Sequence, residues 1–361
     1  YLTLDDPDVR ERAHVAPDDL VRNAPRLTLD EVQREPDLLL AVKRVVDADR
    51  PRANGRFVLT GSANLLLVRR VSESLAGRAT YVNLWPLTRR ERLGRGEPGI
   101  WSALLSTPVG EWVDLIGGEE DKPVDWRDSA RESGYPVPAL ELPDESARAL
   151  WFDGYIRTYL ERDLQALSAV GDLVDFRRLM RAASHRLGGM VNQVEIARDT
   201  RIPRATVQRH LNLLETSFQI CRLPAYSVNR TKRLIKGPKL YWSDPALAHW
   251  LSGAQELTGA HLENLVFVDL LVWREGQVPA PEVLFWRTTT DREVDFVIES
   301  GDRLLAVEVK AAAPRYADTI GLRLFRDEYP DQFVGGLLLH GGGEVLQMSD
   351  GIIAAPWWRV L

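Results

Sequence analysis

Cysteine is almost absent from this 361-residue chain, which contains only Cys221, so a disulfide framework is excluded. The sequence also lacks any apolar run near the roughly 18 residues of a membrane span, and no signal peptide is visible. These absences favour a cytoplasmic protein with no membrane partner. The 45% apolar and 27% charged residues are instead typical of a globular chain with a substantial core.

Strand-like and helix-like segments alternate through the first 93 residues. We expect strands at residues 1–4, 27–30, 56–60 and 79–84, and helices at 36–48 and 65–74. This alternation predicts a mostly parallel α/β sheet. In such sheets, ligands bind at the carboxyl ends of the strands.

Two adjacent acids, Asp30 and Glu31, follow the second expected strand. A strand that ends in Asp-Glu has the form of a Walker-B element, in which the first acid holds Mg²⁺ and the second polarises the attacking water. The alternative is an N-capping Asp followed by a favourable Glu at the start of a helix. The dipeptide alone does not separate these interpretations, and the residues that follow it are needed.

Three motifs occur in order along this part of the chain: Leu29–Gln33, Leu59–Ser62 and Ser72–Arg78. Together they resemble a family of prokaryotic AAA-type ATPases (archaeal-ATPase-like), and the resemblance covers nearly the whole chain. It implies ATP and Mg²⁺ as ligands. It assigns Asp30 and Glu31 as the Walker-B pair, Ser62 or Asn64 as a polar sensor, and Arg78 as an arginine for phosphate charge, in cis or from a neighbouring subunit of a homo-oligomer.

The Gly-rich phosphate loop of that family, G-x-x-x-x-G-K-[ST], does not occur in this sequence. The chain starts at Tyr1 rather than Met, directly in strand-like sequence, so we expect the loop upstream. Without its backbone cradle and lysine, this chain alone should bind ATP poorly and show no ATPase activity.

Positive charge is concentrated between residues 185 and 240, with 11 Lys and Arg against 3 Asp and Glu. Helices at 194–199 and 204–216, a turn at 201–203 and a basic hairpin at 229–241 predict a winged helix-turn-helix. The candidate DNA contacts are Arg204, Thr206, Gln208 and Arg209, with Lys232, Arg233 and Lys236 on phosphates. The alternative is a structural winged helix whose basic surface docks on an acidic neighbour.

Acids return in a predicted hairpin near the C-terminal end, with strands at 293–298 and 303–310. The pattern Asp-x(12)-Glu-x-Lys on paired strands is that of the PD-(D/E)xK nuclease fold. The candidates are Asp295 and Glu308 as Mg²⁺ ligands, Lys310 as the group that orients the water, and Glu263 on the preceding helix as a further carboxylate. The alternative is an exposed polar hairpin with a cross-strand ion pair.

We therefore predict an α/β protein with four parts. They are an AAA-type core at 1–93 that lacks its phosphate loop, a helical lid or linker at 94–184, a winged helix at 185–245, and a restriction-endonuclease-like domain at 246–361. The predicted function is an ATPase that couples nucleotide state to DNA binding and a nuclease-like domain. The alternatives are a non-catalytic, nucleotide-regulated binding module for DNA or protein, and a toxin or defence element that acts on nucleic acid.

Overall fold

The computed structural model describes residues 1–22, 24–49, 55–61, 75–96, 98–118, 122–158 and 173–361. The chain forms two compact units, and Tyr1–Val82 makes up most of the first. The predicted helix at 65–74 and most of a helix predicted at 151–167 lie outside the described residues. None of the helices within the described ranges has the length and apolar character needed to cross a membrane.

The first unit is a parallel sheet of three short strands in the order β1-β2-β3. The strands are β1 (Leu2–Thr3), β2 (Leu27–Asp30) and β3 (Phe57–Leu59), and the helices are α1 (Pro7–Val15), α2 (Pro17–Arg22) and α3 (Leu38–Asp49), with the 3₁₀ turn η1 (Val32–Arg34). Leu29 pairs with Leu2 on one side and Leu59 on the other, which makes β2 the middle of the three. The apolar stripe of α3 is buried, including Leu38, Val42 and Val45.

The strand predicted at 79–84 is wrong. These residues have no regular structure, and Leu84 is 99% exposed. The Asn83 and Trp85 side chains donate to the Glu275 carboxylate, and the Leu87 N–H donates to the Gly134 carbonyl. These side-chain bonds tie the stretch to Glu275, and no described strand pairs with its backbone.

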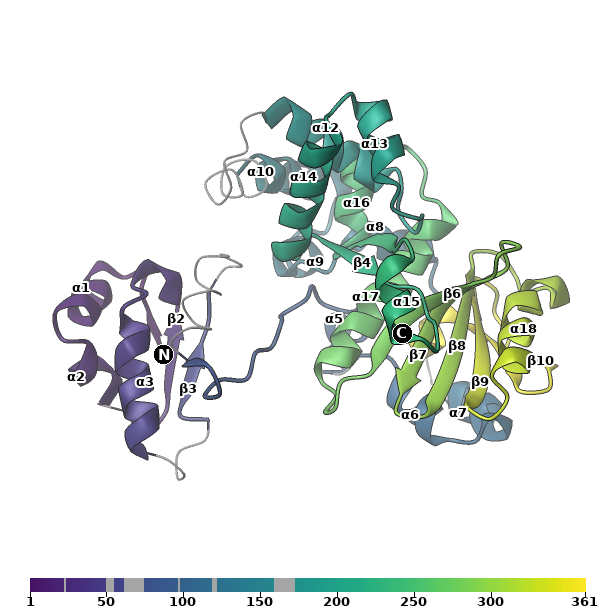
Figure 1. Ribbon diagram of the computed structural model, residues 1–361, viewed down its shortest axis with the longest axis horizontal. Helices are drawn as coiled ribbons and strands as arrows, with labels where there is room; N and C mark the ends of the chain where they lie inside the picture. Colours follow the sequence, from purple (N-terminus) through teal and green to yellow (C-terminus); the bar gives the residue numbers. More distant parts are fainter. Residues whose placement is uncertain (23, 50–54, 62–74, 97, 119–121, 159–172) are drawn as a thin grey trace. The chain divides into compact units, whose positions relative to one another are not determined.

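The second unit is built on a six-stranded mixed sheet in the order β10-β11-β9-β8-β7-β6. Figure 1 shows β7, β8 and β9 side by side at its centre. The strands are β6 (Glu282–Arg287), β7 (Glu293–Ser300), β8 (Arg303–Lys310), β9 (Phe333–His340), β10 (Leu346–Ser349) and β11 (Ile352–Pro356). Helix α17 (Gly259–Glu275) packs on one face through Val266 and Phe267, and α18 (Ile320–Glu328) packs on the other through Leu322 and Phe325.

The remaining helices of the second unit are mostly short. They are α5 (Arg89–Arg92), α6 (Trp101–Ser106), α7 (Trp112–Gly117), α8 (Trp126–Glu132), α9 (Pro136–Leu140), α10 (Glu145–Tyr155), α12 (Leu173–Ser184), α13 (Gln193–Thr200), α14 (Arg204–Thr216), α15 (Arg230–Ile235), α16 (Pro245–Ser252) and α19 (Trp357–Val360), with the 3₁₀ turns η2 (Val109–Glu111) and η4 (Tyr316–Thr319). Helices α13 and α14 and the turn between them occur where the sequence predicted two helices and a turn.

The basic hairpin predicted at 229–241 is only half right. Strands β4 (Ile220–Leu223) and β5 (Lys239–Trp242) pair in antiparallel fashion, but the connection between them contains α15. Asn229 caps this helix by accepting a hydrogen bond from the Thr231 N–H at 3.0 Å. An N-cap asparagine followed by helix-compatible residues was a local signal that the hairpin prediction passed over.

Candidate functional site

Asp30 and Glu31 lie at the carboxyl end of β2, between the ends of β1 and β3. The Leu4 N–H donates to the Asp30 carbonyl at 3.0 Å, and the Val32 N–H donates to the Thr60 carbonyl at 3.1 Å. Between these two bonds, Glu31 adopts φ 58° and ψ 40°, the left-handed region. A non-glycine residue in this region is strained and persists where its surroundings fix it, which is common at functional sites.

The Asp30 carboxylate accepts hydrogen bonds from two hydroxyl groups. One is the Tyr1 hydroxyl at 2.6 Å, and the other is the Thr60 hydroxyl at the end of β3. The Thr60 hydrogen bond and then the Tyr1 hydrogen bond lower the pKa of Asp30 below its ordinary value. The carboxylate is therefore ionised at neutral pH, and its hard oxygen atoms fit Mg²⁺. Thr60 was not among the predicted site residues, although it ends the neighbouring parallel strand.

The other residues predicted for this site have different outcomes. Ser62 and Asn64 lie outside the described residues. The Arg78 guanidinium pairs with the Asp47 carboxylate on α3, with N–O distances of 2.6 and 3.0 Å. Helix α3 returns from the carboxyl end of β2 to the amino end of β3, a path of about 18 Å for 12 residues. Asp47 is in its last turn, so this ion pair holds the Arg78 guanidinium at the end of α3 that is farther from Asp30.

Helix α14 presents an exposed basic face in the second unit. Val207, Leu211 and Leu214 are fully buried on its other face. Arg204, Gln208 and Arg209 are exposed, and Thr206 is partly exposed. The preceding turn contains Arg201 at φ 59° and ψ 29°, a conformation in which glycine is the usual residue.

The three basic residues predicted near the hairpin divide into two groups. Lys232 and Lys236 are exposed on α15 and at its end. Arg233 is instead buried, with its side chain 6% exposed, and pairs with Glu282 on β6 at 2.8 Å and Glu299 on β7 at 3.0 Å. The prediction that Arg233 contacts DNA phosphates is therefore wrong. For this residue, the alternative of docking on an acidic neighbour holds.

The structure brings together the four residues of the predicted nuclease-like site. Phe296 pairs with Val307 across β7 and β8, so Asp295 and Glu308 are adjacent to each other in the next position. The Val309 N–H donates to Asp295 Oδ2 at 3.0 Å, and Lys310 Nζ pairs with Glu308 Oε1. Asp295 is 5% exposed and Glu308 is 6% exposed, so an exposed polar hairpin is not what forms here.

A residue that the sequence analysis did not single out is at the centre of this cluster. Lys239 Nζ, from β5, lies 3.0 Å from Glu263 Oε1, 3.0 Å from Asp295 Oδ1 and 3.5 Å from Glu293 Oε1. Among the described residues, no group of three or more His, Cys, Asp or Glu side chains is arranged to hold a metal ion. The predicted Mg²⁺ site of Glu263, Asp295 and Glu308 therefore does not fit a metal as it stands, because an ammonium group already lies against its oxygen atoms.

Burial and charge act in opposite directions on the ionisable groups of this cluster. Burial raises the pKa of Glu263 to about 7, and the Asp295 charge adds to this effect. Burial and then Asp295 likewise raise the pKa of Glu308 well above its ordinary value. Burial would lower the pKa of Lys239, but the carboxylates of Asp295, Glu263 and Glu293 together raise it. Lys239 is therefore charged and supplies positive charge that these acids require.

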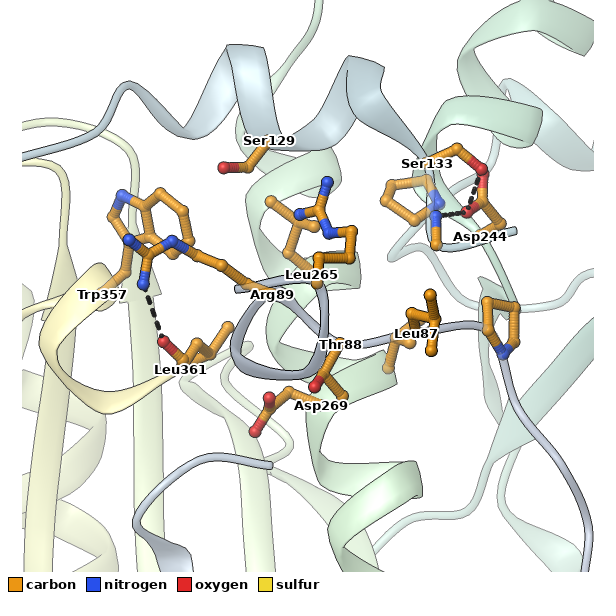
Figure 2. Close-up of a pocket in the computed structure, with 15 residues that line it drawn as sticks. Leu87, Thr88, Arg89, Ser129, Ser133, Asp244, Leu265, Asp269, Trp357 and Leu361 are labelled. Carbon is orange, nitrogen blue, oxygen red and sulfur yellow. Dashed lines mark hydrogen bonds between the residues drawn. The ribbon is translucent and has the colours of Figure 1, made fainter. Parts of the chain in front are cut away.

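A small pocket of about 20 Å³ lies elsewhere in the second unit, and Figure 2 shows the residues that line it. Arg89 donates to the Leu361 carbonyl at 3.2 Å on one side of it, and Ser133 donates to Asp244 at 2.9 Å on the other. The cavity has room for about one water molecule, so it is a structural feature and not a ligand site.

Comparison with known families divides the chain into three matched regions. An AAA domain matches residues 1–93, a domain of unknown function (DUF8612) matches 124–258, and another (DUF4143) matches 258–360. The first and last matches support an AAA-type ATPase family. The AAA domain indicates nucleotide binding, with ATP as the implied ligand and Mg²⁺ as its usual companion.

Curated relatives share much of this chain. An uncharacterized protein of Mycobacterium tuberculosis is 29% identical over 345 residues, which cover 93% of this chain and 69% of the relative. An uncharacterized protein of Haemophilus influenzae is 24% identical over 315 residues, which cover 85% and 71%. One of Methanocaldococcus jannaschii is 24% identical over 283 residues, which cover 77% and 59%. No solved structure matches the chain.

Proposed function

We propose that this chain acts as an AAA-type ATPase whose hydrolytic acids are Asp30 and Glu31. The observation that carries the proposal is their placement at the carboxyl end of the middle described strand, with Asp30 ionised and Glu31 fixed in the left-handed region. The carboxylate of an N-capping aspartate, the alternative for this dipeptide, would accept hydrogen bonds from helix N–H groups. The Asp30 carboxylate instead accepts from two hydroxyl groups and keeps lone pairs for a cation.

In this proposal, Asp30 holds the Mg²⁺ that neutralises the nucleotide phosphates, directly or through water, and Glu31 polarises the attacking water. Ser62 or Asn64 contacts the nucleotide from the next strand. Arg78 acts on the phosphates bound by a neighbouring subunit, because Asp47 in the last turn of α3 holds it away from Asp30 of its own subunit. The phosphate cradle is the part that this sequence does not contain.

The exposed face of α14 favours DNA as a second ligand. Arg204 and Arg209 have no ion-pair partner among the described residues, whereas Arg233 and Lys239 are both paired internally. We therefore propose a winged helix at residues 185–245 that contacts DNA through Arg204, Thr206, Gln208 and Arg209, with Lys232 and Lys236 on phosphates. The C-terminal part has a nuclease-like arrangement of acids, but with Lys239 in place we do not propose that it cleaves DNA.

Substitution of Glu31 tests the ATPase proposal. In a form that carries a phosphate loop ahead of Tyr1, Glu31→Gln should lower ATP turnover by at least about 100-fold and leave ATP binding intact, because it removes only the group that polarises water. Turnover is measured by phosphate release, and binding is measured with a fluorescent ATP analogue. Glu35→Gln, one turn further along the chain, is the matched control and should turn over ATP like the wild type.

The chain from Tyr1 to Leu361, purified alone, completes this test. It should show no turnover above that of the Glu31→Gln protein, because the phosphate cradle is missing from it. Turnover that survives in Glu31→Gln would remove Glu31 from the mechanism. Turnover by the chain alone at the rate of the form with a phosphate loop would contradict the assigned need for that loop.

A further inference from the structure

The buried ammonium of Lys239 has the environment of a bound cation. Its side chain is 3% exposed, and three carboxylate oxygen atoms surround Nζ at 3.0, 3.0 and 3.5 Å. The ammonium group has three N–H donors and no acceptor; it donates hydrogen bonds to Glu263 and Asp295 and forms an ion pair with Glu293. We call these three acids the lysine socket.

The socket and the lysine come from different parts of the second unit. Glu263 lies on α17, and Glu293 and Asp295 lie on β7, whereas Lys239 is the first residue of β5. The β5 backbone is paired at Lys239 on both sides, with Leu223 of β4 and with Met190. These pairs fix the starting point of the side chain and direct its ammonium into the socket.

Other hydrogen-bond donors fix the carboxylates of the socket in place. The Tyr241 hydroxyl donates to Glu263 Oε1, and the Val309 N–H donates to Asp295 Oδ2. Beside Asp295, Glu308 Oε2 is buried and has no hydrogen-bond partner within the described part of the chain. This arrangement leaves a carboxylate oxygen atom beside the socket that could help to bind a cation in place of the ammonium.

We propose that Lys239 is a built-in replacement for a divalent cation, and that this carboxylate cluster binds such an ion only when the ammonium is removed. Divalent cations take carboxylate oxygen atoms at about 2.0–2.6 Å, so an ion that used the same oxygen atoms would overlap the ammonium position. The lysine and the ion therefore exclude each other. Three acids left without either would repel one another in a buried site.

With Lys239 in place, the acid cluster has a structural role. Lys239 links β5 to α17 and β7 by charge, so the cluster holds the segment with β4, α15 and β5 against the six-stranded sheet. Any metal-dependent chemistry at Asp295 and Glu308 would first require β5 to withdraw its lysine. The inference does not depend on the ATPase proposal, because none of these residues lies in the first unit.

Manganese binding to variants of the full chain tests the proposal. Isothermal titration with Mn²⁺ should detect no Asp295-dependent binding in the wild type. Lys239→Ala, which removes the ammonium and opens space for a hydrated ion, should bind Mn²⁺ at least about tenfold more tightly than any Asp295-independent binding to the wild type. Its melting temperature should fall below that of the wild type and recover in part when Mn²⁺ or Ca²⁺ is added. The double variant Lys239→Ala/Asp295→Asn should not recover.

Two further variants keep the test decisive. If Lys239→Ala does not fold, Lys239→Gln retains two N–H donors for the socket and should show the same Mn²⁺-dependent rise in melting temperature. Arg233→Ala is the matched control, because it removes another buried cation of the same segment but from outside the socket, and Mn²⁺ should not restore its stability. Asp295-dependent Mn²⁺ binding to the wild type, or its absence from every folded Lys239 variant, would overturn the proposal.

Discussion

Asp269 on α17 is a buried acid with one satisfied oxygen atom. It is 2% exposed, and its Oδ1 accepts from the Gly99 N–H at 3.0 Å and from the Trp101 indole. Its Oδ2 is buried without a partner among the described residues. Burial raises the pKa of Asp269 to about 7, although the Trp101 and Gly99 hydrogen bonds oppose the rise. This residue therefore makes stability depend on pH in a defined direction.

Between about pH 4 and pH 7, folded Asp269 keeps a proton that the unfolded chain has released. The free energy of unfolding should therefore fall as pH rises through this range, by at most about 1.4 kcal/mol per unit from this residue. Asp269→Asn keeps the acceptor for Gly99 and removes the titration, so its stability relative to wild type should rise from pH 5 to pH 8. Urea unfolding of the second unit at both values measures this.

The control for this prediction is Asp302→Asn at the exposed turn between β7 and β8, which should leave the pH profile as in the wild type. A wild-type profile that runs parallel to that of Asp269→Asn from pH 5 to pH 8 would contradict the raised pKa.

At the scale of residues, the sequence predicted the acids of the C-terminal cluster but not their counter-ion. Asp295, Glu308 and Lys310 could be found because a strand repeats every two residues and the turn fixes the pairing. Lys239 could not be found by spacing, because its partners are 24 and 56 residues away in the chain. A signal was nevertheless present, because Lys239 directly precedes the apolar run Leu240–Trp242. A lysine at the start of a buried strand needs acidic partners for its charge.

At the scale of elements, long periodic segments could be predicted from the sequence, but the pairing partners of strands could not. Strand β8 and helix α14 have the predicted bounds, because each has a clear apolar period. The strand predicted at 79–84 did not form, because sequence shows apolar alternation but not whether a neighbouring strand is there to pair with. Similarly, Val294 and Phe296 are two residues apart on β7 but pack into different hydrophobic cores. The reason is that the pairing of β6 with β7 shifts register there.

The turn between α13 and α14 allows an element-scale prediction. Arg201 is exposed and left-handed, a conformation that costs an L-residue about 1–2 kcal/mol and glycine almost nothing. Glycine also increases the conformational entropy of the unfolded chain, which offsets part of this gain. Arg201→Gly should therefore stabilise the second unit by about 0.5–1 kcal/mol. Urea unfolding measures the change.

Gln208→Gly is the matched control for the turn, because it places glycine at an exposed position inside α14. It should destabilise the unit by about 1 kcal/mol. If both variants lose stability equally, the Arg201 side chain makes a contribution that its backbone conformation does not explain.

At the scale of the whole molecule, many basic residues of the positively charged segment 185–240 form ion pairs within the protein. Of the 11 basic residues between 185 and 240, six form ion pairs, including Arg233 and Lys239 with acids on β6, β7 and α17. Five have no ion-pair partner among the described residues: Arg201, Arg204, Arg209, Lys232 and Lys236. Sequence composition counts all 11 alike, so it overstates the charge that a polyanion would meet.

The salt dependence of DNA binding separates these two sets of charges. For a 30-base-pair duplex between 50 and 200 mM KCl, the logarithm of the binding constant falls linearly with that of the salt concentration, by about one unit of slope per phosphate contact. The double variant Arg204→Ala/Arg209→Ala should lower this slope by about two and weaken binding, because it removes two charges that are free to meet phosphates. Arg233→Ala, which removes a charge already held by Glu282 and Glu299, should leave the slope unchanged in the folded protein. Fluorescence anisotropy at four salt concentrations gives both slopes, and equal slopes for the wild type and the α14 variant would rule out this face of α14 as the DNA contact.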